Sequence, residues 1–171
     1  MGIVLIGYRG SGKTSVGRKL ADRLWQDFVD TDELVVRRAG KTIKEIFEQD
    51  GEGAFRDHES AVVTEVAKLG DAVISLGGGA ILRDENRTAL KEAGHKIIYL
   101  KCDPRVLHER IHADVETAMN RPALTALGGS LDEIEQVLAV REPLYRETMT
   151  AELDVTNLSV EEALVYVVRL L

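Results

Sequence analysis

Two short motifs in this chain could carry chemistry, and they point to different reactions. The stretch "GYRGSGKT", Gly7 to Thr14, has the spacing of a phosphate-binding P-loop. The stretch "HERIH", His108 to His112, has the spacing that places two histidines one helical turn apart on zinc, with the glutamate as general base. Short motifs such as these also arise by chance, so the surrounding sequence must decide between them.

The surroundings of the first motif favour phosphate binding. It follows a strand-like apolar run, Ile3 to Ile6, and leads into a helical pattern that begins at Lys13. Glycines let backbone amides turn inward around an anion, and the helix N-terminus adds its partial positive charge. We expect Lys13 to reach the terminal phosphates of a nucleotide and Thr14 to bind Mg²⁺. The alternative is a tight turn between a strand and a helix.

Acidic residues at the end of the next strand-like run could complete a magnesium site. In "DFVDTD", Asp30 and Asp32 are two residues apart. On an extended segment they would point the same way, toward the carboxyl edge of a sheet. One carboxylate could then face the metal and the other a substrate hydroxyl. The same residues could instead be solvated turn or cap residues.

An arginine–glutamate pair and a glycine run are further candidates. In "GEGAFRDHE", Arg56 precedes Glu59 by about one helical turn, so Glu59 could orient the guanidinium toward an anion. A surface ion pair has the same spacing. Gly77 to Gly79 follow the strand-like run "AVIS", and three successive glycines allow close approach to the backbone. A flexible turn is the alternative there.

Because the chain is acidic overall, the positions of its arginines say more about possible anion-binding sites than their number does. The formal net charge of −7 argues against a nucleic-acid partner. Arg110, Arg121 and Arg141 are nevertheless placed where they could bind phosphates, stack on adenine or hold a carboxylate. Each of them alone is more often a surface charge.

The zinc-like motif lacks a defined third ligand. Asp114 and Glu116 are candidates by position only, whereas a catalytic zinc site needs three protein ligands. We therefore predict that His108 and His112 are partly exposed helix residues.

Strand-like and helical patterns alternate along the chain, which predicts an α/β architecture with a buried parallel sheet. Capping patterns at Thr42, Asp103 and Ser159 mark helix starts. The segment 113–130 has weak periodicity, a proline and a glycine pair, and is either a mobile lid or a plain surface loop. We predict further helices over 13–24, 84–92, 103–111, 131–145 and 160–171, and a strand in "ELDVT".

Length and composition suit one soluble domain over residues 1–171. Hydrophobic residues make up 44% of the chain and charged residues 30%, and no apolar run is long enough to span a membrane. The first residues read as a buried strand and not as a signal peptide, so we expect a cytoplasmic protein without a membrane partner. The single cysteine, Cys102, is predicted to be a packing residue.

Taken together, the motifs resemble those of the shikimate kinase family. The resemblance runs from residue 3 to about residue 150 and rests on "GSGKT", "FVDTD", "GEGAFRDHE", "LGGG", "NRPAL" and "REPLY", in the family's order. It implies a three-layer P-loop kinase fold of the nucleoside-monophosphate-kinase type. In that fold a five-stranded parallel sheet, in the order 2-3-1-4-5, is flanked by helices, with a mobile lid over about 112–128. Trp25 stands where relatives often have glycine, and we expect it to pack locally.

The resemblance also implies an activity and its ligands. A shikimate kinase transfers the γ-phosphoryl group of MgATP to the 3-hydroxyl of shikimate, within aromatic amino-acid biosynthesis, and we expect this chain to act as a monomer. On the nucleotide side the implied residues are Gly10, Ser11, Gly12, Lys13, Thr14 and Ser15 for the phosphates, Arg110 for adenine, Arg121 for the phosphates from the lid, and Thr14 with Asp30, through water, for Mg²⁺.

On the acceptor side, the resemblance implies that Asp32 binds ring hydroxyls and acts as, or assists, the base. Arg56 and Arg141 would bind the shikimate carboxylate, and the backbone of Gly77, Gly78 and Gly79 would contact a hydroxyl. The catalytic residues expected on this basis are Asp32, Lys13 and Arg121.

Other readings remain open at this point. A different small P-loop kinase, acting on gluconate or a nucleotide, would share the P-loop and the lid. A zinc hydrolase would use His108 and His112, and a kinase-fold protein that only binds nucleotide is a third possibility.

Overall fold

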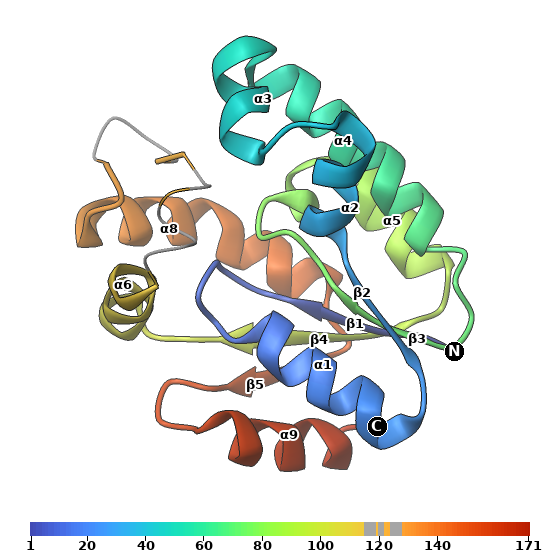
Figure 1. The fold of residues 1–171 in the computed structure, drawn as a ribbon. Coiled ribbons are helices and arrows are strands. Elements are labelled where there is room, and N and C mark those ends of the chain that lie inside the picture. Colours follow the sequence, from blue (N-terminus) through green and yellow to red (C-terminus); the bar gives the residue numbers. More distant parts are fainter. Residues whose placement is uncertain (115–118, 120–121, 124–127) are drawn as a thin grey trace.

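A parallel sheet organises the chain, whose computed structural model describes residues 1–114, 119, 122–123 and 128–171. Within them the sheet has five strands in the order β2-β3-β1-β4-β5, as expected, and each neighbouring pair is parallel (Figure 1). The strands are β1 (Ile3–Ile6), β2 (Asp27–Asp30), β3 (Ala72–Ser75), β4 (Lys96–Lys101) and β5 (Ala151–Asp154). Strands β1 and β3 are buried at every residue, because helices cover both faces of a parallel sheet.

Helices form the two outer layers. On one face α1 packs against α9, and on the other α4, α5 and α8 lie in contact (Figure 1). The helices are α1 (Lys13–Leu24), α2 (Thr31–Ala39), α3 (Ile43–Gln49), α4 (Gly51–Val66), the 3₁₀ helix η1 (Ala80–Leu82), α5 (Asp84–Glu92), α6 (Pro104–Ala113), α8 (Leu131–Thr148) and α9 (Val160–Arg169). No helix in the described part of the chain is long and apolar enough to cross a membrane.

The predicted helix starts are confirmed. Thr42 and Ser159 form capping boxes with Glu45 and Glu162, at the N-termini of α3 and α9. Asp103 caps α6, where proline occupies the first turn. Local side-chain chemistry therefore fixes where these helices begin.

Two local expectations were wrong. The chain does not stay extended through Asp32, because β2 ends at Asp30 and α2 begins at Thr31. Asp30 caps that helix by accepting hydrogen bonds from the backbone N–H groups of Asp32 (3.0 Å) and Glu33 (3.4 Å). Trp25 does not pack locally. It is the C-cap residue of α1, with a left-handed backbone conformation (φ 57°), and it is 96% exposed.

The turn after β1 depends on the absence of a side chain at Gly7. Its φ is 146°, and a Cβ there would lie 2.6 Å from the backbone oxygen of Leu100 in the neighbouring strand β4. Backbone atoms within a paired sheet cannot move aside cheaply. A larger residue at this position would therefore disturb the junction of sheet and P-loop.

We predict that Gly7→Ala lowers the free energy of unfolding by about 1–3 kcal/mol, from backbone strain and overpacking. Gly53→Ala is the matched control, because Gly53 lies inside α4 with open space around its Cα and without a positive φ. That change should raise the free energy of unfolding by about 0.5–1 kcal/mol. Urea unfolding of both variants checks this, and equal effects of the two changes would contradict it.

Candidate active site

The P-loop connects β1 to α1 and leaves the start of that helix without a side-chain cap. Gly10 and Gly12 have φ values of 85° and 93°, and Gly12 occupies the N-cap position. No acidic residue lies in the first turn of α1, whereas Asp, Thr or Ser side chains cap α2, α3 and α9. An uncapped helix N-terminus in a glycine-rich loop is suited to bind an anion.

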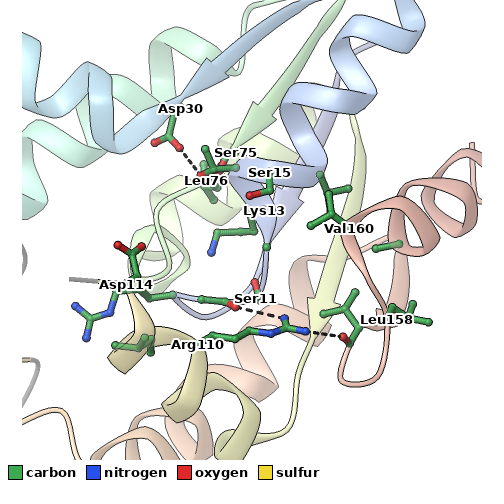
Figure 2. A pocket seen from close by; sticks show the side chains of 18 of the residues that line it. Ser11, Lys13, Ser15, Asp30, Ser75, Leu76, Arg110, Asp114, Leu158 and Val160 are labelled. Carbon is green, nitrogen blue, oxygen red and sulfur yellow. Dashed lines mark hydrogen bonds between the residues drawn. The ribbon is translucent and has the colours of Figure 1, made fainter. Parts of the chain in front are cut away.

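A cavity of about 420 Å³ lies against this loop. It brings together all the nucleotide-side residues predicted from the sequence that the structure describes: Gly10, Ser11, Gly12, Lys13, Thr14, Ser15, Asp30 and Arg110. Figure 2 shows the Arg110 side chain extending from α6 below the P-loop toward the connection between β5 and α9. Its guanidinium donates to the carbonyls of Gly10 (3.5 Å) and Val155 (3.2 Å), which joins the two sides of the cavity.

The Lys13 ammonium group lies against the P-loop. Its Nζ donates hydrogen bonds to the carbonyls of Gly7 (2.8 Å) and Tyr8 (2.9 Å), and the residue is only 8% exposed. These bonds hold the ammonium group against the same loop whose backbone surrounds the cavity. Lys13 is therefore held at the first residue of α1, on the wall of the larger cavity.

Three hard oxygen donors meet beside the P-loop. The Thr14 hydroxyl donates to Asp30 Oδ2 (2.8 Å) and lies 3.5 Å from Ser75 Oγ. Asp30 and Ser75 are labelled in Figure 2. Because Asp30 Oδ1 caps α2, the carboxylate is held in place with its other oxygen toward Thr14. Hydroxyl and carboxylate oxygens are the ligands that Mg²⁺ prefers, so this donor set fits the ion.

A smaller cavity, of about 60 Å³, adjoins the first. Four residues predicted for the acceptor side, Arg56, Gly78, Gly79 and Arg141, line it, whereas Gly77 does not. Ile43, Phe47 and Phe55 supply an apolar wall. Two residues, Asp32 and Arg9, line both cavities. Asp32 therefore lies at the junction of the two cavities, although on the first turn of a helix and not on a strand.

The glycine run allows the close approach of two side chains. A Cβ on Gly77 would lie 2.6 Å from Asp32 Oδ1, and one on Gly79 would lie 2.5 Å from Arg56 Nη1. The missing side chains therefore admit a carboxylate and a guanidinium to the backbone. This is a reason for successive glycines that a flexible turn would not require.

Arg56 is held by a buried carboxylate. Its Nη1 donates to Glu59 Oε2 (2.7 Å), and both side chains are at most 10% exposed. Burial raises the pKa of Glu59 to about 7, although the charge and hydrogen bond of Arg56 act in the opposite direction. The predicted pair is thus buried in the cavity wall and is not a surface ion pair.

Arg9 is a site residue that the sequence analysis missed. It occupies a variable position of the P-loop motif, so the spacing rule gives it no role. Its place on the walls of both cavities follows from the turn of the loop. The sequence did contain one signal for Arg9, namely a positively charged side chain inside a phosphate-binding loop.

Two other predictions concern residues around α6. His108 is half-buried and His112 is exposed, as expected, and the Nδ1 atom of His112 lies 2.8 Å from the carbonyl oxygen of His108. Among the residues that the structure describes, no cluster of three or more His, Cys, Asp or Glu side chains could hold a metal ion.

Cys102 is buried as predicted, and burial raises the pKa of its thiol. Arg121 and most of the predicted lid lie outside the described residues.

The parallel sheet, the P-loop at its carboxyl edge and the adjoining acceptor cavity define a small P-loop kinase. The family model "Shikimate kinase" matches residues 9–171. The chain belongs to the shikimate kinase family.

Individual relatives agree with this assignment. A shikimate kinase of Rhodopirellula baltica is 39% identical over 167 residues, which cover 98% of this chain and 88% of the relative. One of Symbiobacterium thermophilum is 43% identical over 147 residues, covering 86% and 82%. The solved structure of a shikimate kinase from Acinetobacter baumannii in complex with shikimate has a TM-score of 0.90 and 32% identity, covering 99% and 91%.

The raised pKa of Glu59 predicts a pH-dependent contribution to stability. The folded protein binds this proton more tightly than the unfolded chain does, so the contribution is full below about pH 4.5 and is lost as the pH rises toward 7. The difference in unfolding free energy between wild type and Glu59→Gln should therefore decline by roughly 1–3 kcal/mol from pH 5 to pH 8.

Urea unfolding across this pH range measures the effect. Glu52→Gln is the control, because Glu52 also pairs with Arg56 (3.5 Å) but has a side chain that is 65% exposed. A constant difference between wild type and Glu59→Gln would contradict the assignment.

Proposed function

We propose that this chain transfers the γ-phosphoryl group of ATP to the 3-hydroxyl of shikimate, giving shikimate 3-phosphate and ADP. The observation that carries the proposal is the position of Asp32, whose side chain lies where the nucleotide-side cavity meets a cavity lined by two buried arginines. The names of the relatives and the shikimate bound to the Acinetobacter baumannii protein support the choice of acceptor.

On the nucleotide side, we assign the phosphates to the loop Gly10–Ser15 and Lys13. The uncapped N–H groups and the ammonium group would neutralise charge that develops on the phosphates during transfer. Arg110 is assigned to adenine, and Arg121 to the phosphates. Catalysis on this assignment comes from positioning and charge stabilisation.

We assign Mg²⁺ to Thr14 and, through water, Asp30, because their oxygens fit the preferences of the ion. When bound, the ion would neutralise phosphate charge. Asp30 would keep its position through its second oxygen, which caps α2.

On the acceptor side, Arg56 and Arg141 would bind the carboxylate of shikimate through charge-assisted hydrogen bonds. The backbone of Gly78 and Gly79, which line this cavity, would contact a ring hydroxyl. The N–H of Gly77, which was also predicted for this contact, already donates to Thr31. Asp32 would accept the proton of the 3-hydroxyl while that oxygen forms its bond to the γ-phosphorus and the bond to the ADP oxygen breaks. All of these roles are assigned to residues of one chain, so we propose that it acts as a monomer, in the cytoplasm.

The test is ADP release in a coupled assay, with Mg²⁺ and ATP, in the presence and absence of shikimate. We expect release to depend on shikimate, with gluconate and nucleosides as inactive acceptors. Turnover that is independent of shikimate, or greater with another acceptor, would overturn the proposal.

A more specific prediction concerns Asp32. Replacing it by asparagine removes the proton acceptor, so Asp32→Asn should lower kcat by about 10²–10⁴-fold. Binding of ADP, measured by calorimetry, should change by less than about threefold, because the phosphate contacts are assigned to the P-loop. Asp27→Asn is the control, since Asp27 is exposed at the other end of β2 and should keep full activity. Loss of ADP binding in Asp32→Asn would show that the assigned role is wrong.

A further inference from the structure

Tyr145 is a buried phenol that none of the roles assigned above uses. It lies on α8, one helical turn after Arg141, and is completely buried. Its hydroxyl donates a hydrogen bond of 2.6 Å to the carbonyl oxygen of Gly78, which is 67 residues away in the sequence. A buried hydroxyl with so short a bond to a glycine backbone fixes a segment that has little stiffness of its own.

The backbone of the glycine run is held at several points. The N–H of Gly77 donates to Thr31 Oγ1 (2.8 Å), and the carbonyl oxygens of Gly77 and Gly79 accept from residues of η1. The carbonyl of Gly78 has Tyr145 as its donor. By contrast, the N–H groups of Gly78 and Gly79 donate to no acceptor among the residues described. Both of these glycines line the acceptor cavity.

One peptide unit connects these observations. The carbonyl of Gly78 and the N–H of Gly79 belong to the same peptide, which is planar and trans, so the two groups point in opposite directions. When Tyr145 holds the carbonyl from the side of α8, the N–H must face away from α8. The Tyr145 hydroxyl therefore determines the direction of a donor on the cavity wall.

The surroundings keep the phenol in this role. Burial raises the pKa of Tyr145 to about 12, against the opposing charge and hydrogen bonding of Arg141, so the hydroxyl stays protonated as a donor. The ring stacks on Tyr99 at 4.9 Å between centroids, which restrains it on one side. Arg141 also approaches Gly78, because a Cβ built there would lie 3.5 Å from Arg141 Nη1.

We propose that Tyr145 is a positioning residue for the acceptor: its hydroxyl fixes the Gly78–Gly79 peptide so that the Gly79 N–H is presented to a ring hydroxyl. The inference rests on the proposed function for the identity of the acceptor. The orientation of the peptide itself does not depend on that identity.

The first test compares Tyr145→Phe with Tyr99→Phe. Both changes remove one hydroxyl from the same ring stack, but only the first removes the bond to Gly78. We expect Tyr145→Phe to raise the KM for shikimate about tenfold and to leave the KM for ATP within about twofold, as fits loss of one buried hydrogen bond. Tyr99→Phe should leave both values within about twofold.

This pattern separates positioning from a structural role. A variant that is merely less stable contains less active enzyme, which lowers the apparent kcat and leaves the KM for shikimate unchanged. Such a result for Tyr145→Phe, or an equal rise in KM for Tyr99→Phe, would overturn the inference.

A second measurement needs no acceptor. In ¹H–¹⁵N spectra of the whole protein, the Gly79 amide resonance should move in Tyr145→Phe and stay in place in Tyr99→Phe. An unmoved resonance in Tyr145→Phe would overturn the inference even if wild type proved inactive with shikimate. Inactivity of wild type alone, with the resonance moved as expected, would count only against the proposed function.

Discussion

The parallel pairing of β1, β2 and β3 is the constraint on which the site depends. The register places Ser75 beside both Leu5 and Asp30, so the carboxyl ends of three strands lie at one edge of the sheet. The P-loop, the cap of α2 and the glycine run all begin within a few residues of this edge. Because the carboxyl ends of parallel strands lie at the same edge of the sheet, the pairing of the strands is enough to bring together segments that are far apart in the sequence. The same geometry explains why Thr14, Asp30 and Ser75 are neighbours.

Buried charge is the second organising feature. Arg56 and Arg141 are less than 10% exposed and face a small cavity, where isolated guanidinium groups would be costly to desolvate. Glu59 compensates Arg56 directly, and its raised pKa shows that the carboxylate is itself only partly stabilised by that contact. An anionic acceptor carboxylate would complete the charge balance. The two arginines would supply the positive side of that balance, while the glycine backbone beside them is held from two sides by Thr31 and Tyr145.

Sequence reasoning was most successful where structure depends on neighbours in the chain. The helix over Lys13–Leu24, the capping boxes at Thr42 and Ser159 and the fully buried strand β1 all follow from local patterns, and the structure has each of them. It failed for the backbone conformation at Asp32, because a period-two argument assumes a strand, whereas a helix capped by Asp30 begins at Thr31. It failed for Trp25 as well, since nothing in the local pattern shows whether a helix end has a neighbour to pack against.

The sequence by itself determined the class of chemistry and the alternation of strands and helices. A P-loop, a helix cap and a buried strand can each be recognised from the spacing of a few neighbouring residues or from the periodicity of apolar residues. The strand order came from resemblance to a family and not from periodicity, since periodicity carries no information about which strands are neighbours. Only the tertiary structure decided that Asp32 lies between two cavities, that Arg9 lines both, and that Glu59 is buried enough for its pKa to reach about 7. These properties depend on distances between residues of different elements, and the same holds for the hydrogen bond from Tyr145 to Gly78 across 67 residues.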